Sequence, residues 1–159
     1  MVPYTVNTAW CGVDDARRHA PLFTSNIVPD EDVNIFIDEA VELMKGKLRT
    51  FYNLSLFTLP LPDDLKHVRL LCARIAGYKI LASKPDKISL PDMGTLWELA
   101  MGELNQMAQG KLLLPDTYLN TGVVKTSKGY EIKEAGSENT IRGALTPLKT
   151  TTPAPMEWD

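Results

Sequence analysis

The fold is decided by residues 33–51, whose sequence reads VNIFIDEAVELMKGKLRTF. Its apolar side chains recur at intervals of three and four residues: Val33, Phe36, Ile37, Ala40, Val41, Met44, Leu48 and Phe51. That spacing places them on one face of an α-helix. Acidic residues precede the stretch and basic residues end it, an order that suits the helix dipole. The pattern predicts a long amphipathic helix over residues 29–53.

Two further amphipathic helices follow along the chain. Residues 62–83 carry an apolar stripe and stop before Pro85, because proline disfavours helix at the preceding residue. Residues 91–109 carry another stripe, and Gly110 suits a helix C-cap. The expected inward positions are Leu65, Val68, Leu71, Cys72, Ile75, Tyr78 and Ala82, then Leu96, Trp97, Ala100, Leu104, Met107 and Ala108. Long helices with short connections favour an all-α fold, a small antiparallel helical bundle.

The composition changes sharply along the chain. Leu, Ile, Val and Phe supply 32 of the 93 residues from 22 to 114, but only 7 of the 45 residues from 115 to 159. The first proportion is typical of a packed core, and the second is too low for a segment that folds alone. We therefore expect an N-terminal segment at 1–27 with a short helix near 13–19, a helical bundle core at 28–115, and a long extended C-terminal arm at 116–159.

The arm contains one strand-like stretch. Residues 123–126 and 130–133 are rich in β-formers, with Gly129 between them as the expected turn residue. The pattern is consistent with a short β-hairpin. Because an isolated two-stranded hairpin is marginal in water, this one would need a neighbour.

Size and charge exclude several classes of protein. The chain has 159 residues, 17 basic against 20 acidic, and a formal net charge of -3, so it lacks the surplus of cations expected of a dedicated nucleic-acid binder. No apolar run approaches the ~18 residues of a membrane span. The first twenty residues do not read as a signal peptide, and two cysteines are too few for a disulfide framework. We expect a soluble protein made in the cytoplasm.

The search for an active site finds little. Nucleophile-elbow, P-loop and dinucleotide-binding motifs are all missing from the sequence. His67 and Cys72 lie five positions apart, a poor spacing for two metal ligands on one helix. An enzyme would have to rely on Glu98, Glu103 and His67, so we expect no enzyme, no metal and no cofactor.

Two tryptophans and one set of basic residues each allow more than one interpretation. Trp10 suits either packing under the short N-terminal helix or contact with a neighbouring chain. Trp158, close to the end of the arm, suits an anchor for a partner. Lys66, Arg69 and Arg74 are the one set that a small helical DNA-binding or regulatory protein would use, although they alternate with core positions.

A family resemblance rests on five short segments. They are 37–40 (IDEA) leading to Leu48, 52–54 (YNL), 59–62 (LPLP), 70–78 (LLCARIAGY) and 109–115 (QGKLLLP). Together they resemble the head completion, or adaptor, proteins of tailed bacteriophages, also called head-tail connector proteins. The resemblance covers residues 28–115 and consists of hydrophobic patterns rather than catalytic motifs.

The resemblance implies a structural role in the virion. Such proteins form a homo-oligomeric ring, with about a dozen copies, beneath the portal protein at the neck of the particle. They dock after DNA packaging, enclose the DNA without reading its sequence, and offer a surface to a stopper or tail-terminator protein. In relatives a C-terminal extension contacts the portal. Here the portal-contacting residues are expected to be Val123, Val124, Tyr130, Ile132, Leu148 and Trp158.

Overall fold

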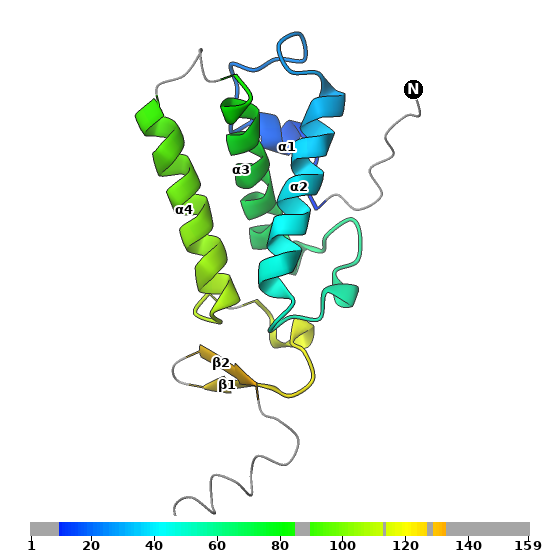
Figure 1. The fold of residues 1–159 in the computed structure, drawn as a ribbon. Coiled ribbons are helices and arrows are strands. Elements are labelled where there is room, and N and C mark those ends of the chain that lie inside the picture. The colour runs from blue at the N-terminus through cyan, green and yellow to red at the C-terminus, as the bar shows by residue number, and fades with distance from the viewer. Residues whose placement is uncertain (1–9, 85–89, 113, 127–128, 133–159) are drawn as a thin grey trace, which may run out of the picture.

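Four α-helices and a two-stranded sheet make up the described part of the computed structural model, which covers residues 10–84, 90–112, 114–126 and 129–132 (Figure 1). The helices are α1 (Val13–Arg17), α2 (Asp30–Leu48), α3 (Lys66–Ala82) and α4 (Leu90–Ala108). The three long helices run alternately down, up and down, and α1 lies across them (Figure 1). The expected all-α antiparallel bundle is confirmed.

The first long helix is shorter than its apolar pattern predicts. α2 begins after Pro29 and ends at Leu48, with Arg49 as its C-cap. The predicted helix ran five residues further, to 53. The chain leaves the helix there because the Phe51 carbonyl accepts a hydrogen bond from the Asn120 N–H, at 2.8 Å, and the Asn53 N–H donates to the Tyr118 carbonyl, at 2.7 Å. Tertiary pairing thus overrides the helical periodicity of this segment.

The second long helix is the centre of the molecule. A 3₁₀ turn, η2 (Asp63–Leu65), leads into α3, and α1, α2 and α4 all pack on it. Its buried residues are Val68, Leu71, Cys72, Ala73, Ile75, Ala76, Gly77 and Ile80. They occupy more than the single stripe expected, because a helix with neighbours on several sides buries more than one face.

The third long helix follows its predicted pattern closely. Ala100, Leu104 and Met107 are fully buried, and Trp97 is half-buried with its ring 4.6 Å from that of Tyr78 on α3. Gly110 has a φ of 67°, the left-handed conformation that glycine adopts without a steric penalty at a helix C-terminus. The expected C-cap is confirmed.

The N-terminal segment belongs to the core. Trp10, Cys11, Ala16, Ala20 and Phe23 are all buried in the same apolar cluster as the long helices. The ring of Trp10 lies 5.4 Å from that of Phe57. Of the two environments expected for Trp10, the structure therefore shows packing within its own chain. The core is therefore not confined to residues 28–115.

One arginine fastens the loop between α1 and α2. Arg17 donates to the carbonyls of Phe23, at 2.6 Å, and Val28, at 2.7 Å, and forms an ion pair with Asp30 at the start of α2. A guanidinium with several donors in a fixed fork is suited to holding two carbonyls and a carboxylate together. The loop can thus keep Phe23 and Val28 in the core.

After α4 the chain returns to the end of α2. Leu114 is buried, the 3₁₀ turn η4 (Asp116–Tyr118) follows, and Leu119 forms an isolated antiparallel bridge with Tyr52. The hairpin comes next, with β1 (Val123–Thr126) paired to β2 (Gly129–Ile132). Gly129 pairs with Thr126, so it lies in the strand and not in the turn as predicted. No helix in the described part of the chain is long and apolar enough to cross a membrane.

Candidate functional site

The hairpin projects from the bundle beyond the end of α2 (Figure 1). Its register pairs Val123 with Ile132 and Val124 with Glu131. The sheet of the described residues has only these two strands, so each strand keeps one edge without a partner strand. Such an edge presents backbone N–H and C=O groups to which another chain can add.

The six expected contact residues do not share one environment. Val123 and Val124 are half-buried, and Val123 packs against the core of the bundle. Ile132 is 56% exposed, which leaves most of an apolar side chain in water. Tyr130 lies in β2 opposite Lys125. The last two expected residues, Leu148 and Trp158, lie outside the described residues.

The base of the hairpin is fixed to the bundle by polar contacts. Asn120 donates through its side-chain amide to the carbonyls of Arg49, at 2.8 Å, and Thr50, at 3.2 Å. These carbonyls follow the end of α2, where helices leave acceptors without intrahelical donors. The Tyr118 hydroxyl donates to the Asp64 carboxylate, at 2.9 Å, and its ring meets Phe57 edge-on at 5.4 Å. The hairpin is therefore attached to a rigid support.

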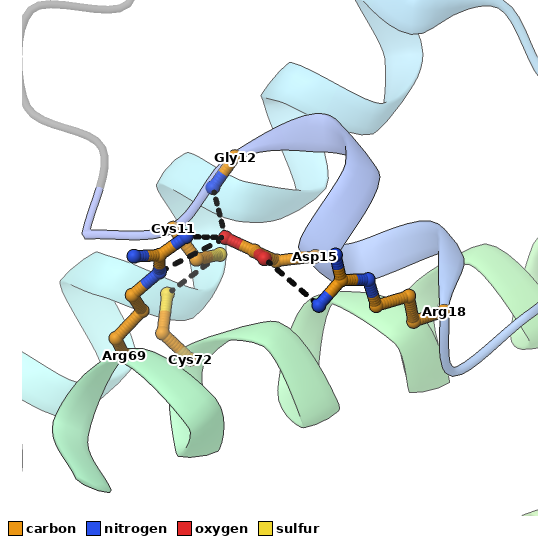
Figure 2. A network of polar contacts seen from close by, with 6 residues as sticks. All are labelled: Cys11, Gly12, Asp15, Arg18, Arg69 and Cys72. Atoms are coloured by element: carbon orange, nitrogen blue, oxygen red, sulfur yellow. Dashed lines mark hydrogen bonds and ion pairs between the residues drawn. The ribbon is translucent and has the colours of Figure 1, made fainter. Parts of the chain in front are cut away.

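A second polar feature lies where the N-terminal segment meets α3 (Figure 2). The Asp15 carboxylate accepts hydrogen bonds from the Gly12 N–H, at 3.1 Å, and from Nε and Nη2 of Arg69, at 3.0 and 2.8 Å. Burial opposes ionisation of Asp15, but the bonds from Gly12 and Arg69 outweigh it and hold the pKa of this carboxyl below its ordinary value. The ion pair links α1 to α3.

Two surface hollows flank this ion pair. One, of about 240 Å³, is lined by Trp10, Cys11, Gly12, Pro60, Leu61 and Arg69. The other, of about 320 Å³, is lined by Asp15, Arg18, Leu61, Pro62, Asp63, Lys66, Arg69 and Leu70. The first hollow has Arg69 as its one charged lining residue, and the second combines three cationic with two acidic residues. Neither hollow therefore offers the concentrated positive field that a phosphate backbone requires.

The cationic set that a DNA-binding helix would use is largely engaged. Arg69 is paired with Asp15, and Arg74 donates to the Glu103 carboxylate of α4 at 2.5 Å. Lys66 is exposed at the start of α3. Two of the three cations therefore hold helices together.

The residues on which an enzyme would rely do not converge on a cleft. His67 Nε2 lies 3.8 Å from Glu103 Oε2, and Glu103 is already bound by Arg74. Glu98 is exposed on α4. Among the described residues no group of three His, Cys, Asp or Glu side chains is placed to hold a metal ion. His67 is a surface residue, and Cys72 is a core residue, as its place among the inward positions of this helix predicted.

Two contacts between distant residues were not expected from the sequence. Cys11 and Cys72 lie side by side in the core, with their sulfur atoms 3.5 Å apart (Figure 2). The Asn120 side chain donates hydrogen bonds to the end of α2, about seventy positions earlier in the sequence. Neither carries a local pattern, since both depend on how distant segments fold together.

The comparisons with known proteins leave the family open. No protein-family model, no curated protein and no solved structure matches this chain.

Proposed function

We propose that this chain is a structural virion protein, a head-tail connector adaptor that forms a ring on the portal of a tailed bacteriophage. The ring, of about a dozen copies, docks after DNA packaging and offers a stopper or tail-terminator protein its attachment surface. The protein is made in the host cytoplasm and works at the neck of the virion. The resemblance of residues 28–115 to adaptor proteins motivates the proposal.

One observation carries the partner-binding part of this proposal. The hairpin lies outside the bundle (Figure 1), and among the described residues neither of its two outer edges has a partner strand. It also bears the exposed Ile132. It is anchored at its base by Asn120, so an added strand would meet a positioned template. In a ring each copy repeats the contact, and many weak contacts together give strong attachment.

The charge distribution supports a ring that surrounds DNA without binding it tightly. The net charge is -3, and Arg69 and Arg74 are neutralised by Asp15 and Glu103. A channel lined with free cations would hold the phosphate backbone through counterion release. A small DNA-binding or regulatory protein is the alternative, and salt-dependent binding of duplex DNA by the purified protein would favour it.

The test combines the purified protein with the cognate portal protein. We expect rings on the portal in electron micrographs, and co-sedimentation of the two proteins. Ile132→Asp should weaken binding at least about tenfold, because burial of an isoleucine contributes roughly 1.5–3 kcal/mol. The matched control is Leu22→Asp. Leu22 is 75% exposed in the loop at the other end of α2, and this change should leave binding unaltered (Figure 1).

Two results would contradict the proposal. Unchanged portal binding by Ile132→Asp would remove the hairpin from the contact. Absence of any complex between the unaltered protein and portal, under conditions where portal itself is assembled, would reject the adaptor role. Trp158→Ala tests the rest of the arm separately, and we expect it to weaken binding without changing thermal stability.

A further inference from the structure

The two cysteines of the chain form a buried pair. Cys11 lies just before α1 and Cys72 in the middle of α3, 61 positions away, and their Sγ atoms are 3.5 Å apart (Figure 2). The two residues are 6% and 0% exposed. A disulfide bond is about 2.0 Å long, so the sulfur atoms would have to approach by about 1.5 Å. Rotation of the two side chains would have to supply this movement.

Only one of the two cysteines lines a surface hollow of the described residues. Cys11 lines the hollow of about 240 Å³ between Trp10, Pro60 and Arg69, whereas Cys72 does not. That volume admits a molecule as small as hydrogen peroxide. Cys72 is completely buried behind Cys11, and no other cysteine exists in the chain. The geometry thus distinguishes a cysteine at the lining of a surface hollow from one that the core encloses completely.

We propose that Cys11 and Cys72 are a modification site, which a two-electron oxidant of the hydroperoxide class converts to a reversible intramolecular disulfide. The Cys11 sulfur attacks one oxygen of hydrogen peroxide, the O–O bond breaks, and a sulfenic acid and one water result. The Cys72 sulfur then attacks the Cys11 sulfur. The S–O bond breaks, and the departing hydroxide takes the Cys72 thiol proton as a second water. Two thiols and one peroxide become one disulfide and two waters.

The reaction is expected to be slow. The hydrogen bond with Cys11, then burial, and then the Asp38 and Asp15 carboxylates raise the pKa of the Cys72 thiol. The thiolate is the attacking form, so a thiol held protonated attacks rarely. Cys72 therefore suits the second step, in which proximity compensates for low reactivity. The pair therefore forms its disulfide only after prolonged exposure to oxidant, and it does not act as a rapid sensor.

The disulfide would tie the N-terminal segment to the central helix. It would close a loop of about sixty residues that includes α1 and α2. A cross-link of that length restricts the unfolded chain strongly and raises the thermal midpoint, on the order of 10 °C for a protein of this size. This inference is independent of the connector proposal, since it concerns the folded monomer alone.

The experiment treats the reduced full-length protein, in native buffer, with hydrogen peroxide. The protein is then unfolded, alkylated with iodoacetamide and weighed by mass spectrometry. We expect a loss of two hydrogen masses, no alkylation, and a peptide pair joined through Cys11 and Cys72. The product should run as a monomer on a non-reducing gel. Its thermal midpoint should rise by about 10 °C and return on addition of dithiothreitol.

Three results with the unaltered protein would overturn the proposal. Full alkylation of both cysteines after long exposure, a disulfide-linked dimer, or added oxygen masses without loss of hydrogen would each reject it. Cys11→Ser provides the matched control, because it keeps the size of the side chain and removes the partner. Its thermal midpoint should not change with peroxide, and a rise equal to that of the unaltered protein would also contradict the assignment.

Discussion

At the scale of single residues, one glycine determines how closely α1 approaches α3. A Cβ atom placed on Gly77 would lie 2.5 Å from the His19 Cβ and 3.1 Å from the Ala16 carbonyl oxygen. Both distances are shorter than ordinary van der Waals contact. The short N-terminal helix can lie against the central helix only because position 77 has no side chain.

Gly77→Ala should therefore destabilise the protein. Alanine is the better helix former by up to about 1 kcal/mol, but overpacking a core typically costs about 1–3 kcal/mol. We expect the free energy of unfolding, measured by urea denaturation, to fall by about 1–2 kcal/mol. Gly46→Ala in α2 is the control, because nothing lies within 4 Å of the added carbon there. It should raise stability by about 0.5–1 kcal/mol, and a rise in both variants would contradict the close contact.

A histidine at the same contact makes stability depend on pH. Burial, assisted by the Arg74 cation and opposed by the Asp15 carboxylate, lowers the pKa of His19 below its ordinary 6.5. The unfolded chain therefore binds this proton at a higher pH than the folded protein does. The contribution of His19 to stability is complete above pH 6.5 and is lost as the pH falls below it.

We expect the urea midpoint of the protein to decrease between about pH 7.5 and about pH 5.5. In His19→Gln, which keeps the Cβ and a polar end but cannot take up a proton, the decrease should be smaller. An equal decrease in the two proteins would mean that His19 is as easily protonated in the folded state as in the unfolded chain.

At the scale of elements, the hairpin depends on the junction that precedes it. Asn120→Ala removes the two hydrogen bonds to the end of α2, each worth about 0.5–1.5 kcal/mol. We expect amide hydrogen exchange in β1 and β2 to accelerate by about tenfold, while exchange in α3 changes less. Thr121→Ala, at the exposed neighbouring position, should leave the hairpin amides unaltered. Equal exchange rates in both variants would show that the side-chain amide of Asn120 does not hold the hairpin in place.

The long helices were predictable because their information is local. In α4 the buried residues Ala100, Leu104 and Met107 recur at helical spacing, and Gly110 marks the end. The end of α2 was not predictable in the same way. The hydrogen bond between Asn120 and Phe51 competes with helix formation there. No local sequence pattern indicates a partner that lies about seventy positions away.

At the scale of the whole molecule, both flanks of the chain close onto the three-helix body. The N-terminal segment contributes Trp10 and Phe23 to the core, and the returning segment contributes Leu114. Composition could not place Trp10, because its position before a short helix suited two environments equally. The cysteine pair was not predictable either. The spacing of Cys72 relates it only to residues on its own helix, whereas Cys11 lies 61 positions away.

The joint burial of the N-terminal segment and the bundle predicts that they unfold together. Trp10 is 4% exposed, and α1 packs on α3. Removing a buried tryptophan from a core costs about 3–5 kcal/mol, a large share of the roughly 5–15 kcal/mol by which proteins are stable. Detaching the segment would therefore leave too little stability for the bundle to persist as a separate native state.

A protein carrying Trp97→Phe and Trp158→Phe tests this expectation, since Trp10 is then its only tryptophan. Phenylalanine at 97 keeps an aromatic ring beside Tyr78. In urea, the transition seen by Trp10 fluorescence should coincide with that seen by far-ultraviolet circular dichroism, because a single cooperative unit loses both signals at once. A fluorescence change at lower urea would instead make residues 10–23 a separate unit, and the bundle would then be stable with one face of α3 uncovered.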